Sequence, residues 1–301
     1  MRKPLLLLLA AVPLAVASCG PHATPSPEER LRVVATTTLV ADVVHQVGGE
    51  HIALTTLLPV GVDPHAFEPR PQDLAAVAEA EVVFANGAGL EAFLPPLLES
   101  AGGKARLVEV SEGIALLPLP GGDEHGTGDP HTWMDPNNVL VWVENITRAL
   151  TEADPAHAED YRANAEAYAG ELRALDAWIR EQVTQIPPAR RKLVTDHAVF
   201  GYFAQEYGFE QIGAVIASFS TDAAPSAREL ATLEDTIRQY EVPAIFVGAN
   251  VNSALAEQIA ADTGVRLVRV YTGSLSEPTG EAGSYLAFMR YNVSAIVEAL
   301  K

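Results

Sequence analysis

Three histidines have similar sequence neighbours, because each directly follows an aspartate or an Asp-Pro pair. They are His65, His131 and His197, and the same 66 residues separate the first from the second and the second from the third. Neutral imidazole is a ligand that suits zinc and its first-row neighbours. A single histidine behind Asp-Pro is commonly turn chemistry and nothing more. Three such settings in one chain favour a metal site, provided that the fold brings the rings together.

Apolar, strand-like runs alternate with helical stretches around these histidines. In the first half we expect strands at 32–36, 52–58, 81–85 and 106–110, and helices at 39–47, 71–80, 91–100 and from 136 onward. In the second half we expect strands at 192–195, 211–216, 244–247 and 266–270, and helices at 199–207, 226–240, 253–263 and 283–300. This alternation with short connections predicts parallel sheets that are covered by helices on both faces.

The longest helical pattern fills residues 155–187 and ends at two prolines. Apolar side chains recur there at steps of three and four, which makes an amphipathic stripe. About 32 residues at ~1.5 Å each reach nearly 50 Å, enough to run along two lobes. The stripe is rich in Ala and Tyr and lacks the sustained leucine seam of a coiled-coil dimer. We therefore expect a monomer with α/β lobes at 31–154 and 188–301, joined by one backbone helix.

The expected strands also indicate where the three rings would meet. Ligands of open α/β sheets bind beyond the carboxyl ends of the strands. His65 and His131 belong to the first expected lobe and His197 to the second. The predicted fold therefore has two lobes with parallel four-stranded sheets, one long backbone helix, and a metal site in the cleft between the lobes.

Composition and charge narrow the class of protein. The chain has 301 residues, a hydrophobic content of 48% and a formal net charge of −19. Such an acidic chain is a poor partner for nucleic acid, whose phosphates require a basic face. The acidic surface instead suits a soluble protein that attracts cations over long range.

The N-terminus resembles an export signal. Residues 1–18 combine a basic start with an apolar run that is too short to span a bilayer, as in a secretory signal peptide. Small residues precede Cys19, the only cysteine, in the pattern of a bacterial lipobox with lipid on its sulfur; a plain signal peptide is the weaker alternative. Residues 19–30 are then a flexible tether to the membrane. The folded part has no thiolate to offer a metal.

Several motifs together resemble one known family, the cluster A-I solute-binding lipoproteins of zinc and manganese ABC transporters. The matching segments are residues 63–69, 129–136, 195–203, 218–226 and 285–292. The likeness extends over about residues 31–301, and the lipobox fits it. It implies two α/β lobes on one rigid helix, with a divalent metal held between them as transported cargo. It also implies a membrane-anchored, extracytoplasmic protein that is not an enzyme and that delivers the ion to an ABC permease.

The resemblance assigns the metal ligands to His65, His131 and His197. Manganese-selective members often carry Glu at the third position and zinc members usually carry His, so His197 favours Zn²⁺ over Mn²⁺. Nitrogen-rich coordination points the same way. Because ligation requires neutral imidazole, we expect metal affinity to fall below about pH 6.5, the ordinary histidine pKa. The aspartates in front of the histidines are expected to accept hydrogen bonds from the rings and to fix their tautomers.

The fourth ligand position departs from the family pattern. Many relatives have an Asp where this chain has Gly273. Water, Asp222 and Glu277 are the candidates to complete the coordination, and water is preferred. His125 lies in an acidic, Gly-rich loop at 118–128, and it is either a weak metal-collecting residue or part of a solvated loop.

A zinc-dependent hydrolase or hydratase is the rival hypothesis, because three histidines with an open position also describe a zinc that activates water. Such an enzyme needs a general base beside the metal and room for an organic substrate. Glu68 and Asp135 are the candidates for the base, although orienting the site loops is the simpler interpretation. The HExxH motif is absent. Adhesion to host surfaces is a third hypothesis, which no residue here supports by itself.

Overall fold

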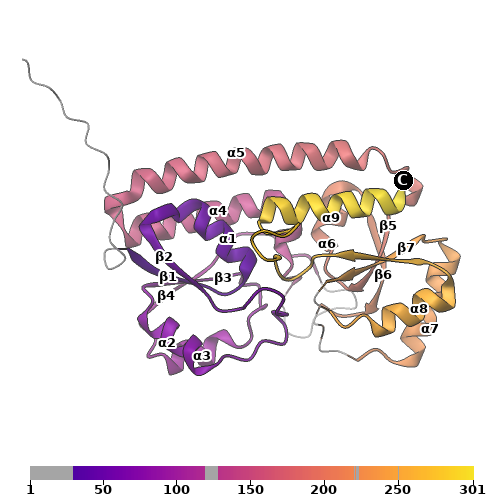
Figure 1. Cartoon of the computed structure of the whole chain (residues 1–301), viewed down its shortest axis with the longest axis horizontal. Coiled ribbons are helices and arrows are strands. Elements are labelled where there is room, and N and C mark those ends of the chain that lie inside the picture. The colour runs from indigo at the N-terminus through magenta and orange to yellow at the C-terminus, as the bar shows by residue number, and fades with distance from the viewer. Residues whose placement is uncertain (1–29, 119–127, 220, 222–223, 250) are drawn as a thin grey trace, which may run out of the picture.

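The computed structural model describes residues 30–118, 128–219, 221, 224–249 and 251–301. They form two α/β lobes, each on a parallel four-stranded sheet (Figure 1). The first sheet has the order β2-β1-β3-β4, with β1 at Leu31–Ala35, β2 at Ile52–Thr56, β3 at Val82–Ala85 and β4 at Arg106–Glu109. The second has the order β6-β5-β7-β8, with β5 at Lys192–His197, β6 at Glu210–Ile216, β7 at Ala244–Gly248 and β8 at Arg266–Val270. The predicted fold class is confirmed.

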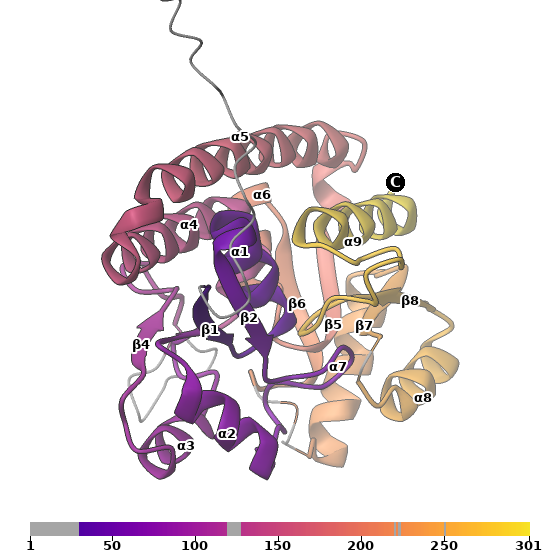
Figure 2. The same cartoon turned by 60° about the vertical axis from the view of Figure 1, so that its left-hand side comes forward.

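Helices cover both faces of each sheet (Figures 1 and 2). In the first lobe, α1 Thr38–Gly48 and α4 Pro136–Ala153 lie on one face, and α2 Pro71–Glu79 and α3 Leu94–Ser100 lie on the other. In the second lobe, α6 Gly201–Tyr207 and α9 Tyr285–Leu300 lie on one face, and α7 Ala227–Gln239 and α8 Ala254–Thr263 on the other. Within the residues that are described, no helix combines the length and the apolar character needed to cross a membrane.

Side chains with short polar groups fix where several helices begin. Thr37 accepts a hydrogen bond from the first turn of α1, Asp135 from that of α4, and Ser284 from that of α9. Ser226 and Glu229 form a reciprocal capping box at the start of α7. Each cap satisfies a backbone N–H that the helix itself leaves without a partner. The position of α4 matters most for function, because its cap lies four residues after His131.

The helix α5, Ala158–Val183, runs along both lobes (Figures 1 and 2). Its 26 residues correspond to about 39 Å. It is shorter than the predicted 155–187, because Pro155–His157 form a separate 3₁₀ turn and the α-helical pattern ends at Val183. The amphipathic stripe is confirmed by its buried residues, which are Tyr161, Ala165, Tyr168, Ala169, Leu172, Leu175, Ile179 and Val183.

The largest hydrophobic core includes residues of α5 and of both lobes. Trp142 from the first lobe, Leu172 from α5 and Phe288 from the second lobe all belong to it. Two smaller clusters fill the opposite faces of the sheets, one against α2 and α3 and one against α7 and α8. Because one core is continuous across both lobes, separating them would expose apolar surface, and wide opening of the cleft is therefore costly.

Helix α3 begins at Leu94, whereas the sequence predicted a start at 91. The difference is due to Glu91, whose side chain turns into the lobe and is only 6% exposed as a residue. Its carboxylate accepts the Thr36 hydroxyl at 2.6 Å and the Asn86 backbone N–H at 2.7 Å. Burial raises the pKa of this carboxyl. The two bonds tie together the loops that leave β1 and β3, close to the cleft.

Candidate metal centre

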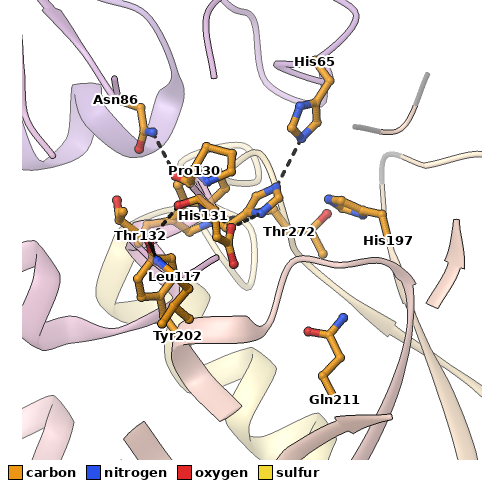
Figure 3. Close-up of polar contacts among 12 residues, drawn as sticks. His65, Asn86, Leu117, Pro130, His131, Thr132, His197, Tyr202, Gln211 and Thr272 are labelled. Atoms are coloured by element: carbon orange, nitrogen blue, oxygen red, sulfur yellow. Dashed lines mark hydrogen bonds and ion pairs between the residues drawn. The ribbon is translucent and has the colours of Figure 1, made fainter. Parts of the chain in front are cut away.

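The three predicted histidines come together at the cleft between the lobes (Figure 3). His65 lies in the loop after β2, His131 precedes the 3₁₀ turn Thr132–Met134, and His197 is the last residue of β5. Their ligand nitrogens all lie within 4.8 Å of one another. The Nε2 atoms of His65 and His131 are 3.2 Å apart, close to the roughly 3.3 Å between nitrogens of a tetrahedral zinc with bonds of about 2.0–2.1 Å. In the described part of the chain, no other group of three such side chains converges in this way.

His131 is the most enclosed of the three, with 0% of its surface exposed. Asp129 Oδ1 lies 2.7 Å from His131 Nδ1 and accepts the His131 backbone N–H at 2.9 Å. With Nδ1–H as the donor to this carboxylate, Nε2 keeps a free lone pair for a metal. Tyr202 comes from the second lobe, and its hydroxyl donates to the Asp129 carbonyl at 2.7 Å. The His131 turn is therefore held from both lobes.

Burial decides the protonation of the Asp129–His131 pair. Burial, together with the charge of His197, lowers the pKa of His131 well below its ordinary value. Burial also raises the pKa of the Asp129 carboxyl to about 7, and the backbone hydrogen bond from His131 offsets only part of this effect. Both shifts follow from the cost of charge in a buried site. A divalent cation at Nε2 would offset that cost by favouring the ionised carboxylate.

His197 is held in the same way from the second lobe. Asp196 Oδ1 lies 2.9 Å from His197 Nδ1 and accepts the His197 backbone N–H at 2.7 Å. Asp196 Oδ2 accepts the N–H of Gly248, at the end of β7, at 2.8 Å. Burial raises the pKa of Asp196, but the hydrogen bonds and charge of His197 and the Gly248 N–H outweigh it, so the pKa lies below its ordinary value. Asp196 is thus an ionised acceptor that leaves Nε2 of His197 available to bind a metal.

His65 is the partly exposed member of the three. Its ring meets the other two edge-on, with centroids 5.3 Å from His131 and 5.7 Å from His197. Burial, and then the charges of His131 and His197, lower the pKa of His65 to about 3. Two of the three rings, His65 and His131, therefore take up a proton only at a pH below the 6.5 expected from the sequence. Asp63 accepts the backbone N–H of His65 at 3.0 Å, and not a ring N–H as expected.

A cavity of about 10 Å³ lies among the three histidines. Its other lining residues are Val62, Asp63, Pro64, Trp133, Thr221, Val251, Thr272 and Gly273. That volume has room for about one water-sized particle. Trp133 packs edge-on against the His131 ring, with centroids 5.2 Å apart, and donates its Nε1–H to the Thr272 carbonyl at 2.8 Å. The first lobe is thereby fastened to the second beside Gly273.

Gly273 lines the cavity at the sequence position where many relatives have the aspartate that serves as the fourth metal ligand. A Cβ atom at this position would lie 2.8 Å from Pro64 Cδ, so the present packing of Pro64 requires a glycine. Glu277, a candidate ligand, is exposed and does not line the cavity, so the structure does not place it at the site. The other candidate, Asp222, lies outside the described residues, as do His125 and Cys19. Water as the fourth ligand stays a prediction.

Sequence reasoning missed the side chains that support the site from a distance. Asn86 Nδ2 donates to the Pro130 carbonyl at 3.0 Å across 44 residues of chain, and Tyr202 reaches Asp129 across 73. Thr221 Oγ1 donates to Asp63 Oδ2 at 2.5 Å across 158 residues. Tyr202 and Thr221 lie in segments that carry the family resemblance, but the supporting role of all three residues depends on contacts between loops that only the fold brings together.

Residues 33–299 match the model of the family described as ZnuA, zinc-uptake complex component A periplasmic. The chain belongs to this family. ScbA of Streptococcus cristatus, a metal ABC transporter substrate-binding lipoprotein, is 34% identical over 302 residues, with 98% of this chain and 97% of that protein covered. The manganese-binding lipoprotein MntA of Halalkalibacterium halodurans is 35% identical over 296 residues, with 97% of each covered. The solved periplasmic zinc-binding protein TroA of Treponema pallidum has a TM-score of 0.84 at 28% identity, with 90% of this ZnuA-family chain and 99% of that one covered.

Proposed function

We propose that this ZnuA-family protein is the extracytoplasmic solute-binding component of an ABC importer. It captures a divalent transition metal in the cleft and delivers it to a membrane permease. The observation that carries the proposal is the convergence of three imidazoles, whose ligand nitrogens lie within 4.8 Å of one another between two lobes. The near full-length likeness to a metal ABC transporter substrate-binding lipoprotein supports the transport role.

The proposed ligands are the Nε2 atoms of His65, His131 and His197. All three rings are neutral when they bind, so they do not reduce the net charge of +2 that the ion brings to the site. Asp129 and Asp196 lie directly behind two of the rings and carry the compensating negative charge. Capture therefore replaces water on the ion by imidazoles that are already aligned, which limits the entropy lost on binding.

We propose zinc as the preferred ion, with manganese second. The relatives' names allow both, because MntA is named for manganese and TroA for zinc. The donor set supports zinc: the three converging groups are all imidazoles, and no carboxylate of the described residues joins them. Manganese is the harder ion and gains less from nitrogen than from carboxylate ligands.

A hydrolase or hydratase is not favoured by the site. The cavity of about 10 Å³ leaves no room for an organic substrate. Glu68 is exposed, and Asp135 accepts the Asn137 backbone N–H at 2.8 Å as the cap of α4. Neither carboxylate lines the cavity, so neither is placed as a general base.

The rest of the chain fits a tethered binding protein. We propose that residues 1–18 are a signal peptide, that Cys19 carries lipid, and that residues 19–30 connect this anchor to lobes at 31–154 and 188–301. The lipid anchor is the proposed contact with the membrane. The folded part is proposed to be a monomer and is not proposed to bind nucleic acid. Because both lobes share the core beneath α5, release is expected to use movements of the site loops and small shifts of the lobes.

The test combines metal titration with transport. Zinc and manganese affinities would be measured by competition against a chelator for the wild type and for His65→Ala, His131→Ala and His197→Ala. His45→Ala is the matched control, since His45 is an exposed residue of α1 away from the site. Cells lacking the gene would then be supplied with each variant, and their metal uptake would be measured.

We expect each site variant to lose zinc affinity by at least about a hundredfold and to fail to restore uptake. The His45→Ala protein should behave as the wild type does. Unchanged affinity in all three site variants would show that the ligands lie elsewhere. Turnover of ester or hydration substrates that disappears in His131→Ala would favour the enzyme hypothesis instead, and tighter binding of manganese than of zinc would overturn the metal preference.

A further inference from the structure

The three histidines are not supported equally. His131 and His197 each have a carboxylate against the ring, from Asp129 and Asp196 in their own lobe. Both of these rings are almost fully buried, at 0% and 3% exposed. His65 is partly exposed, and no carboxylate of the described residues forms an ion pair with its ring. Its position depends instead on its backbone.

Asp63 provides that backbone support and also reaches across the cleft. Its Oδ1 accepts the His65 N–H at 3.0 Å, which closes a tight turn over Pro64. Its Oδ2 accepts the hydroxyl of Thr221, from the second lobe, at 2.5 Å. Both Asp63 and Thr221 line the cavity. One carboxylate therefore connects the turn that carries His65 to the opposite lobe.

A second connection holds only the start of the same loop. The Gly61 N–H donates to Ser274 Oγ at 2.9 Å, and Ser274 is 1% exposed. This contact lies four residues before His65, whereas Asp63 is bonded directly to the His65 backbone. The Gly61 contact anchors the loop, and the Thr221 contact sets where its tip lies over the cavity.

We propose that Thr221 is a positioning residue that controls how long the metal is retained. Its hydroxyl orients the Asp63 carboxylate, which holds His65 over the cavity as the last ligand to close and the first to leave. The inference rests on the proposed metal-binding function and adds a specific route of release. Loss of the Thr221 contact frees the His65 turn while His131 and His197 keep their own carboxylates.

This arrangement predicts an effect on dissociation and not on association. The incoming ion first meets the two rings that are already held by Asp129 and Asp196, so its capture does not wait for the Thr221 contact. Dissociation requires His65 to swing away, and the charge-assisted hydrogen bond at Asp63 opposes that step. Loss of one hydrogen bond to a charged group corresponds to about a tenfold change in rate, at the lower end of its usual range.

The experiment uses Thr221→Val, which keeps the shape of the side chain and removes the hydroxyl, with Thr221→Ser as the matched variant that keeps it. Thr232→Val controls for the general effect of such a change, since Thr232 is an exposed residue of α7. Metal release from the Co²⁺-loaded and Zn²⁺-loaded proteins into excess chelator would be followed by stopped flow, under conditions where the rate is independent of chelator. Association rates and the visible Co²⁺ spectrum would be recorded alongside.

We expect Thr221→Val to release metal about tenfold faster, with an association rate within twofold of the wild type and an unchanged Co²⁺ spectrum. Thr221→Ser and Thr232→Val should release metal at the wild-type rate. In an Asp63→Ala background, Thr221→Val should add nothing. A release rate for Thr221→Val within twofold of the wild type, or an equal rise in Thr232→Val, would overturn the role of Thr221 while leaving the metal site intact. Failure of the wild type itself to bind metal would instead contradict the proposed function.

Discussion

Metal affinity should depend far less on pH than three ordinary histidines would allow. At pH 5.5 a histidine with a pKa of 6.5 is protonated by about ten to one. If all three ligands behaved so, the metal would have to displace three protons, and affinity would fall by about 10³ between pH 7.5 and 5.5. In this protein the pKa of His65 is lowered to about 3 and that of His131 lies well below 6.5. Those two rings are therefore neutral at pH 5.5 and have no proton to lose. The Asp129 carboxyl, whose pKa is raised to about 7, does lose a proton when a cation at Nε2 favours its ionised form, so the fall should be about 25-fold.

The assay is an equilibrium competition against a chelator whose own pH dependence is known, at pH 7.5, 6.5 and 5.5. Zinc is the ion, and the bound fraction gives the dissociation constant at each pH. A fall in affinity close to 10³ would show that His65 and His131 titrate as exposed residues do. That result would refute the buried, preformed arrangement of the three rings.

The comparison requires that the metal-free protein stay folded over this range, and the pKa shifts change its free energy of unfolding in two opposite directions. Below about pH 6.5 the unfolded chain binds protons at His65 and His131 that the folded chain does not, so these residues reduce the free energy of unfolding as the pH falls. Asp129 and Asp135 have the opposite effect, because their folded pKa values of about 7 and about 6 exceed the unfolded value near 3.9. The two effects partly cancel at pH 5.5, and circular dichroism at each pH is the control.

Three further predictions test other parts of the structure. Gly273→Ala should weaken zinc binding by about tenfold or more, because the new Cβ lies 2.8 Å from Pro64 Cδ beside His65. Gly170→Ala is the control, since the space around Gly170 is open, and it should leave zinc binding unchanged. Competition titration compares the two variants, and equal affinities would contradict the role of the close packing. Asp129→Asn should lower zinc affinity by about 10–100-fold, since it removes the charge behind one ligand ring, and an unchanged dissociation constant would show that this carboxylate is dispensable. Leu172→Ala should reduce the free energy of unfolding by about 2–5 kcal/mol, because Leu172 is 0% exposed in the core shared by both lobes. Urea should unfold the variant in one cooperative transition, and two separate transitions would show that the lobes unfold independently.

The sequence predicted the lobes and the three histidines because their signals are local. Alternating strand and helix patterns decided the fold class, and the stripe on α5 made the joining helix visible. His65, His131 and His197 were found because each follows an aspartate in a turn. Their convergence then followed from one rule, that the carboxyl ends of parallel strands face the binding cleft.

The remaining features depend on contacts that no local pattern encodes. The start of α3 was misplaced because Glu91, a good helix former, instead turns inward to Thr36 and Asn86. The role of Asp63 was misjudged because its carboxylate faces the His65 backbone and Thr221. Burial, which lowers the pKa of two histidines and raises that of Asp129, is a property of the assembled cleft. The expected onset of proton competition near pH 6.5 was too high for this reason.

The most direct test of the metal site is a crystal structure of the zinc-loaded protein with anomalous scattering measured on both sides of the zinc edge. We predict a single zinc peak in the cleft, about 2.0–2.1 Å from the Nε2 atoms of His65, His131 and His197, with a water molecule in the fourth position beside Gly273. A peak that lacks any one of these three nitrogens, or that lies outside the cleft, would contradict the assignment.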